Sequence, residues 1–477
     1  MENKKPKYIE LAFLLAIFLG INYLILSWLS PSHHVIPAKA GIQVINPAPA
    51  GMPETIASKE ISLTSSGNRI SNIKLLNYQP VELLANPGEF IEFGIIGGGD
   101  FTKTITISDN YIINVAIKAK NANAVPYARI TRGEGKKPGM MLAASSGGIA
   151  GANGKIERES WSDMKDKGVV FESAADGFAG FEDQYWQTIV QASAPSTIRM
   201  KNIGDDRFQA DISAANAGSE SAFRIFAGPK SQKILNAADA QMPGVGRTID
   251  YGWFSFLSRP FLWALTALHD LVGNYGLAII ILTLILRTLM IPLTRKSYQS
   301  MAAMQKMQPE MQRIQKLYKD DRARLQQEMM SLYSKTKANP MSGCLPMLLQ
   351  IPIFFALYKA LIIAVEMRSS GFLWISDLAA ADPTNVLNLF GLLPYAPPSW
   401  LPAIGILPIL MGASMWLQMR LSSNASGATM PGMGFMKWIP LVFVVLFAGL
   451  PAGLVLYWTI SNLFGIAQQY YIKRTLR

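Results

Sequence analysis

Cysteine and histidine are almost absent from this sequence of 477 residues. It contains one cysteine, Cys344, and three histidines. An internal disulfide and a thiolate metal cluster are therefore both excluded. His33 and His34 lie in a proline-rich stretch and His269 flanks an apolar run, so we expect neither a metal site nor another cofactor.

The long apolar runs also lack the side chains that catalysis inside a membrane requires. An intramembrane aspartyl protease needs two aspartates within its spans, and a serine protease needs a base; these runs contain no aspartate and no histidine. The sequence also has no glycine-rich phosphate loop followed by Lys-Ser or Lys-Thr. We therefore expect no catalytic residues and no ATPase activity.

One arginine interrupts this apolar character. Arg287 lies inside the run Tyr275–Thr294, where a guanidinium costs about 2.5–3.5 kcal/mol on insertion scales and cannot be discharged. The other apolar runs contain no carboxylate, so a water-filled, positively charged cavity is its simplest environment. The alternative is that Arg287 snorkels to the cytoplasmic headgroups, since the run ends about one or two turns later.

Positive charge is unevenly distributed along the chain. Residues 31–250 hold 22 basic and 22 acidic residues, so the whole net charge of +12 lies outside that range. A nucleic-acid domain would concentrate its charge on a folded surface, and we expect no nucleic-acid specificity. The excess around 295–337, 420–437 and the tail places these segments and both termini in the cytoplasm. The neutral part then faces the periplasm, and the chain lies in a bacterial inner membrane.

The apolar runs predict six membrane spans, each needing about 20 residues. The first, at 1–30, is expected to be an uncleaved anchor, with cleavage as the alternative because Ala38–Ala40 has the residues of a cleavage site but lies far from the apolar core. An aromatic segment at 251–268 is expected to be an interfacial helix. The remaining spans are predicted at 275–293, 344–365 and 401–419, and as two short antiparallel helices within 438–472.

Residues 58–250 predict a β-sandwich that follows a linker at 31–57. Short alternating runs such as Tyr111–Lys118 are separated by Gly, Asn, Asp and Pro, which is typical of sandwiches. The expected fold class is a polytopic α-helical membrane protein with an inserted periplasmic β-sandwich domain.

Residues 295–338 predict a cytoplasmic helical hairpin. Methionine and leucine recur there at spacings of three and four, and Asp320–Asp321 marks a turn. The stripe is either the seam of a solvated coiled coil or a docking surface that adapts to varied partners. The residues expected at the docking surface are Met301, Met304, Met311, Arg313, Lys316, Arg322 and Arg324.

Polar side chains within the spans are few. Thr283 lies one turn before Arg287 on the same helical face, and contacts between helices are the favoured alternative for Ser461 and Asn462. Short helices at 438–472 would thin the bilayer, and with Arg287 this would ease the passage of an acidic segment. The candidate groove residues are Arg287, Thr283, Gln350, Tyr457, Trp458 and Ser461.

Several motifs in one order resemble the YidC-type membrane protein insertases, bacterial relatives of the mitochondrial Oxa insertases. In the second half of the chain these are Asp250-Tyr-Gly-Trp253, Val272-Gly-Asn-Tyr-Gly276, Arg287, Pro292-Leu-Thr294, Asn339-Pro340, Gly343-Cys344, Gln350-Ile-Pro352, Ala356-Leu-Tyr358, Pro451-Ala-Gly-Leu-Val-Leu-Tyr457 and Ser461-Asn462. Phe226-Ala-Gly-Pro-Lys230 resembles the end of the periplasmic domain of Gram-negative members.

The resemblance implies that nascent membrane proteins are inserted, and helped to fold, alone or beside the Sec translocon. It implies a five-helix core around a groove open to the cytoplasm and to lipid, with Arg287 and Thr283 in the groove. Tyr457 and Trp458 occupy the place of a tyrosine pair of some members, so one groove hydroxyl is missing. The hairpin resembles the segment that engages ribosome–nascent-chain complexes and the signal recognition machinery. The competing interpretation is a small-solute transporter or anion channel, although no second broken helix pair is evident.

Overall fold

The computed structural model describes residues 54–476, except 79–80, 97, 122, 135–145, 153, 167–168, 173–176, 216–217, 219, 320, 337–344, 392–402 and 427–437. The predicted anchor at 1–30 and most of the predicted linker lie outside the described residues. The last four residues of that linker, Glu54–Ala57, form a strand, so this part of the linker prediction was wrong. Their alternation of buried and exposed side chains fits the edge of a sheet.

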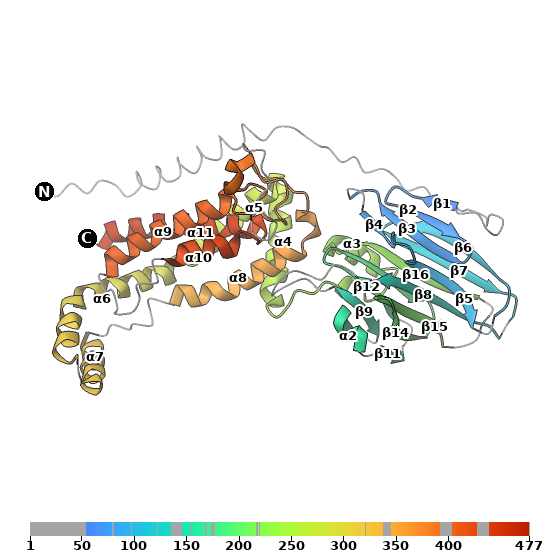
Figure 1. Ribbon diagram of the computed structural model, residues 1–477, viewed down its shortest axis with the longest axis horizontal. Coiled ribbons are helices and arrows are strands. Elements are labelled where there is room, and N and C mark those ends of the chain that lie inside the picture. Colours follow the sequence, from blue (N-terminus) through green and yellow to red (C-terminus); the bar gives the residue numbers. More distant parts are fainter. Residues whose placement is uncertain are drawn as a thin grey trace. The chain divides into compact units, whose positions relative to one another are not determined.

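Two antiparallel sheets form the β-sandwich that the alternating runs predict (Figure 1). One sheet has the order β1-β2-β3-β5-β8-β15-β14-β11, with β4 beside β3. The other has the order β10-β9-β12-β13-β16-β7-β6. The strands are β1 (Glu54–Ala57), β2 (Ile61–Ser66), β3 (Arg69–Leu75), β4 (Val81–Leu83), β5 (Phe90–Ile96), β6 (Phe101–Ser108), β7 (Ile112–Ala119), β8 (Val125–Gly133), β9 (Gly147–Ala152), β10 (Lys155–Ser160), β11 (Val169–Glu172), β12 (Phe178–Glu182), β13 (Trp186–Ala192), β14 (Ser196–Gly204), β15 (Arg207–Ala214) and β16 (Glu220–Pro229).

Alternate residues of these strands build one hydrophobic core between the sheets. In β8 the side chains of Ala128 and Ile130 are fully buried, whereas Tyr127 and Arg129 between them are partly exposed. Strand residues alternate between the two faces of a sheet, so this pattern assigns one face to the core. Phe93 of β5 meets Phe223 of β16 across the sandwich, with ring centroids 5.9 Å apart.

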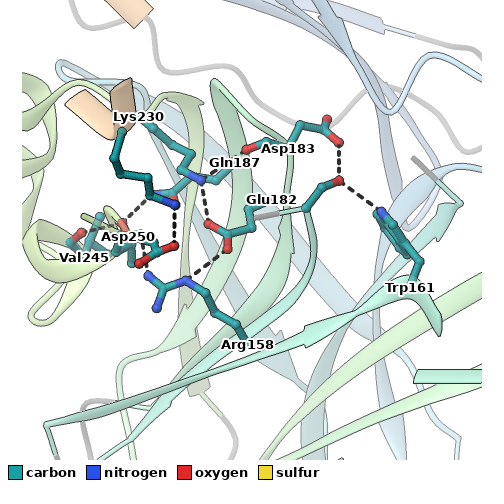
Figure 2. A network of polar contacts seen from close by, with 11 residues as sticks. Arg158, Trp161, Glu182, Asp183, Gln187, Lys230, Val245 and Asp250 are labelled. Carbon is teal, nitrogen blue, oxygen red and sulfur yellow. Dashed lines mark hydrogen bonds and ion pairs between the residues drawn. The ribbon is translucent and has the colours of Figure 1, made fainter. Parts of the chain in front are cut away.

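A buried ionic network lies on the outer face of the seven-stranded sheet, beneath the segment that follows η1 (Figure 2). Lys230 Nζ lies 2.8 Å from Glu182 Oε2, and both side chains are at most 4% exposed. Arg158 Nε approaches the other oxygen of Glu182 at 3.1 Å, and its Nη2 donates to the Thr248 carbonyl at 2.7 Å. Removing one partner of such a pair leaves a charge uncompensated, so the network binds β10, β12 and β16 to the segment after η1.

The helices follow in the order that the sequence predicts, with shifted boundaries. They are α2 (Trp161–Asp166), α3 (Gln232–Asp239), η1 (Val245–Arg247), α4 (Ser255–Val272), α5 (Tyr275–Leu289), α6 (Ile291–Leu317), α7 (Arg322–Thr336), α8 (Leu345–Ile363), η3 (Val365–Met367), η4 (Val386–Gly391), α9 (Ile406–Ser426), α10 (Ile439–Phe447) and α11 (Ala452–Leu476). The hairpin helix α6 begins within the predicted second span, because the chain bends by 56° between α5 and α6. The chain breaks between α10 and α11, within the predicted pair of helices at 438–472. The helix α10 is short, with 9 residues, but α11 has 25 residues, so the prediction of a second short helix was wrong.

Within the described part of the chain, no single helix is both long and apolar enough to cross a bilayer. Only α5 together with the first residues of α6, to Ser300, meets these two criteria as a bent pair. The count of six spans stays a prediction.

Candidate functional site

The arginine that interrupts the apolar run lies near the end of α5. The side chain of Asn274 accepts a hydrogen bond from the Leu277 amide at 3.2 Å and so caps the start of this helix. Apolar residues then fill the helix as far as Arg287, whose charge suits the negative end of the helix dipole. Pro292 lies in the first turn of α6, where its missing amide costs least. It directly follows the bend between α5 and α6.

Arg287 makes its direct polar contact with α11. Its Nε donates to the Ser461 hydroxyl at 2.6 Å, and Ser461 itself is only 2% exposed. The hydroxyls of Tyr457 and Tyr298 lie close enough to interact with the guanidinium charge. No ion pair to Arg287 occurs among the residues that the structure describes, so its charge is met there by neutral hydroxyls.

A second contact joins α8 to the same stretch of α11. Gln350 Nε2 donates to the hydroxyl of Tyr457, whose side chain is 3% exposed. The structure thus brings Arg287, Gln350, Tyr457 and Ser461 together from three helices. The sequence favoured contacts between helices for Ser461 and Asn462, and both make one. Ser461 accepts from Arg287 of α5, and Asn462 donates to Ser414 of α9 at 3.1 Å.

Two of the predicted groove residues stand apart from this set. Thr283 is fully buried, and its hydroxyl donates to the Ile279 carbonyl of its own helix at 2.6 Å. Trp458 packs against Phe354, Phe443 and Phe447, with ring centroids 5.2–6.0 Å apart. Thr283 therefore contributes to helix packing, and Trp458 contributes to an aromatic cluster between α8, α10 and α11.

Tyr298 is a neighbour of Arg287 that the sequence did not reveal. It lies in α6, in a segment expected to be cytoplasmic, eleven residues after Arg287. A straight helix would separate the two Cα atoms by about 16 Å, and the bend after α5 shortens that distance. Eleven residues are about three helical turns, so Arg287 and Tyr298 lie on one helical face. This spacing is the sequence feature that could have predicted their proximity.

The hairpin places its basic residues toward solvent. Arg313, Lys316 and Arg324 are exposed, and Met311 is 6% exposed. The burial of Met311 fits the alternative of a packed helical seam, and its role in docking stays a prediction. The backbones of Met301, Met304 and Arg322 lie within α6 and α7, and their side chains lie outside the described parts.

Comparison with known proteins identifies relatives over most of the chain. Residues 267–477 match the family model described as 60Kd inner membrane protein, and residues 96–264 match the YidC periplasmic domain. The "Membrane protein insertase YidC" of Rickettsia canadensis is 37% identical over 87% of this chain and 78% of its own length. The protein of that name from Sinorhizobium medicae is 35% identical, covering 87% of this chain and 80% of its own length.

A solved structure, "Active YidC insertase crystal structure with the first transmembrane domain resolved", is 18% identical with a TM-score of 0.41, over 88% of this chain and 95% of that one. The family assignment depends instead on the two domain models and on relatives more than a third identical over most of their length. The chain belongs to the YidC family of membrane protein insertases.

Proposed function

We propose that this chain inserts nascent membrane proteins into the bacterial inner membrane and helps them to fold, alone or with the Sec translocon. In this mechanism the polar part of a client passes along a groove beside Arg287, while its apolar part slides into lipid. The observation that carries the proposal is a half-buried arginine, late in an apolar helix, whose polar contacts among the described residues are hydroxyls. A guanidinium held in this way keeps its charge available for a passing carboxylate.

The neutral partners of Arg287 support a transient interaction with clients. A resident carboxylate would neutralise the arginine, and a client would then have to break that pair. A hydrogen bond from a charged donor to Ser461 holds the side chain in place without removing its charge. The attraction of two unit charges grows as the dielectric falls, so acidic client segments gain most.

Three arginine variants test this role. Arg287→Ala is expected to slow insertion of a single-span client with an acidic translocated segment by at least about tenfold, or ~1.4 kcal/mol of activation free energy. Arg287→Lys keeps the charge but loses the planar fork, and is expected to retain part of the rate. Arg295→Ala removes an exposed arginine of α6 and serves as the matched control. The measurement is protease protection of the client in reconstituted vesicles.

The anion-channel alternative makes a separable prediction. Chloride flux through the purified chain in liposomes, together with unchanged client insertion by Arg287→Ala, would favour the channel. A client whose acidic residues are replaced by amides should depend less on Arg287. If the parent chain, Arg287→Ala and Arg287→Lys insert the acidic client equally well, the charge of Arg287 has no part in the mechanism.

We also infer that the hairpin receives ribosome–nascent-chain complexes and the signal recognition machinery. The exposed Arg313, Lys316 and Arg324 support this, because basic side chains on a solvated helix suit anionic partners. Reversing these three charges should weaken co-sedimentation with ribosomes translating a client, and leave insertion of a ribosome-free client unchanged.

A further inference from the structure

A cavity of about 460 Å³ opens on the face of the nine-stranded sheet that points away from the core. Its walls come from β5, β8, β15 and β14, which are neighbours in that sheet (Figure 1). Ile130, Ile198 and Ile212 point into the core and are fully buried. Neighbouring residues of a strand point to opposite faces of the sheet. Arg129, Arg199 and Asp211, each adjacent in sequence to one of these isoleucines, therefore project into the cavity.

A row of alternating charges crosses this face. The strand register places Arg69, Glu92, Arg129, Asp211 and Arg199 directly opposite one another on five consecutive strands. Glu92 lies 3.7 Å from Arg69 and 3.8 Å from Arg129, and Arg129 lies 2.6 Å from Asp211. Opposite charges facing each other across strands stabilise a sheet, and each inner member of the row has a neighbour on both sides.

The row ends on Arg199, a cation with no partner among the residues that the structure describes. Asp211 accepts hydrogen bonds from Arg129 and from Gln209, which contacts both of its oxygens at 2.7 Å. Val170 stands opposite Arg199 on the next strand. Among the described residues, Arg199 forms neither an ion pair nor a hydrogen bond, and it is exposed. The row therefore has three cations and two anions, and one monoanion would neutralise it.

The rest of the lining combines an apolar platform with free hydroxyls. Gly94 has no side chain, and a Cβ there would lie 2.7 Å from Tyr127 Oη. The Tyr127 ring consequently lies across the β5 backbone, beside Ile96, which is 57% exposed. The hydroxyls of Tyr127, Thr197 and Ser213 have no hydrogen-bond partner within the described parts of the chain. Each of them can both donate and accept.

We propose that this cavity binds the carboxylate of an acidic residue in a peptide segment. Arg199 takes the carboxylate, since the planar guanidinium matches its two oxygens. Asp211 repels a dianion such as phosphate, and Tyr127 with Ile96 takes the apolar side chain beside the acidic residue. The three hydroxyls pair with the peptide amides, which a fatty acid lacks. The site is independent of Arg287 and goes beyond the proposed insertion function.

Equilibrium binding to the full chain in lipid nanodiscs tests the site. The probe is a fluorescein-labelled peptide, Ser-Leu-Glu-Leu-Ser, and its twin carries Gln in place of Glu. Fluorescence anisotropy is expected to show saturable binding of the acidic peptide and at least tenfold weaker binding of the twin. Arg199→Ala should weaken the acidic peptide at least tenfold, and Arg199→Lys less. Lys201→Ala is the matched control, because Lys201 is exposed on the same face of β14 outside the cavity.

Three outcomes would overturn the assignment. Equal binding of the two peptides would exclude a carboxylate site. An Arg199→Ala effect no larger than that of Lys201→Ala would exclude the cavity as its location. Displacement of the peptide by hexanoate at peptide-like concentrations would show that a simple carboxylate is sufficient. Because Arg199 is exposed, its variants should keep the fold, which the unchanged binding of a conformational antibody to the domain checks.

Discussion

Glu366 is a carboxylate that the fold holds partly away from water. It lies in η3, directly after α8, and the Ser231 hydroxyl donates a hydrogen bond to it. Tyr78 and Tyr251 are close enough to interact with its charge. Burial raises the pKa of Glu366 above its ordinary value of 4.5, and the bond from Ser231 offsets that effect only in part. Folding therefore shifts Glu366 toward its protonated form relative to the unfolded chain.

Replacing this residue by glutamine should stabilise the protein at neutral pH. The pKa of Glu366 is raised in the folded state, so protonation of this residue stabilises the fold. This stabilisation is fully present below about pH 4.5 and is lost as the pH rises through the folded pKa. Glu366→Gln stays neutral, so its free energy of unfolding, measured by thermal denaturation, should exceed that of the parent chain by about 1 kcal/mol at pH 8 and converge with it below about pH 4.5. Glu157→Gln, at an exposed position of β10, should show no such pH dependence. A stability difference that is independent of pH would contradict the assignment.

At the scale of elements, the segment from Ala364 to Asn385 ties three helices together at one end. The carbonyls of Leu378 and Ala380 accept the amides of Gly453 and Ala452 at 2.9 and 2.7 Å. Asp382 accepts the Leu407 amide at 2.8 Å. First-turn amides have no partner within their own helix, and this segment satisfies them for α9 and α11. Asn274 extends the same arrangement to α5 by donating to the Gly371 carbonyl at 3.1 Å.

Close approach of α5 to this segment requires a glycine. A Cβ on Gly276 would lie 2.2 Å from the ring of Phe372, which is itself buried. Gly276→Ala should therefore destabilise the chain by about 1–2 kcal/mol, since overpacking outweighs the better helix propensity of alanine. Gly449→Ala is the matched control, because a Cβ there meets nothing within 4 Å, and it should be neutral or slightly stabilising. Thermal unfolding in detergent measures the stability of both variants. Equal midpoints for Gly276→Ala and Gly449→Ala would show that the Phe372 ring moves aside without loss of stability.

At the scale of the whole molecule, the periodicity of the sequence predicted the helices and strands. It did not predict which of them contact one another. The alternating pattern predicted the sandwich, and the apolar region at 438–472 predicted the break between α10 and α11. The motifs gave the family, which the comparisons confirmed. The position of Ser461 in α11 does not say which helix it faces, and the bend that brings Tyr298 to Arg287 depends on packing between distant segments. The alternating row ending at Arg199 depends on strand register, which pairs Arg129 with Asp211, 82 positions later in the chain.

The β-sandwich and the helices are joined by contacts around the end of α8. Asp250, at the end of the sandwich sequence, lies 2.8 Å from Lys359 Nζ. Gly252, at φ 69°, lies beside the Lys359 stem, and Gln184 of the sandwich donates to the Ile362 carbonyl at 2.9 Å. Burial raises the pKa of Asp250, but the hydrogen bond and charge of Lys359, with the Gly252 amide, together hold it below 3.8.

A double-mutant cycle measures how far this pair couples the two parts. Asp250→Asn and Lys359→Met should each destabilise the chain at pH 7 by about 1 kcal/mol, a value discounted because Asp250 is 35% exposed. The double variant should lose less than the sum of the two, because the second change has no partner left to break. Since the pKa of Asp250 is lowered, the contribution is present above pH 3.8 and lost as the pH falls through the folded value. Thermal midpoints of the detergent-solubilised chain between pH 7 and pH 3 report it, and strictly additive losses would mean that the ion pair does not couple the sandwich to α8.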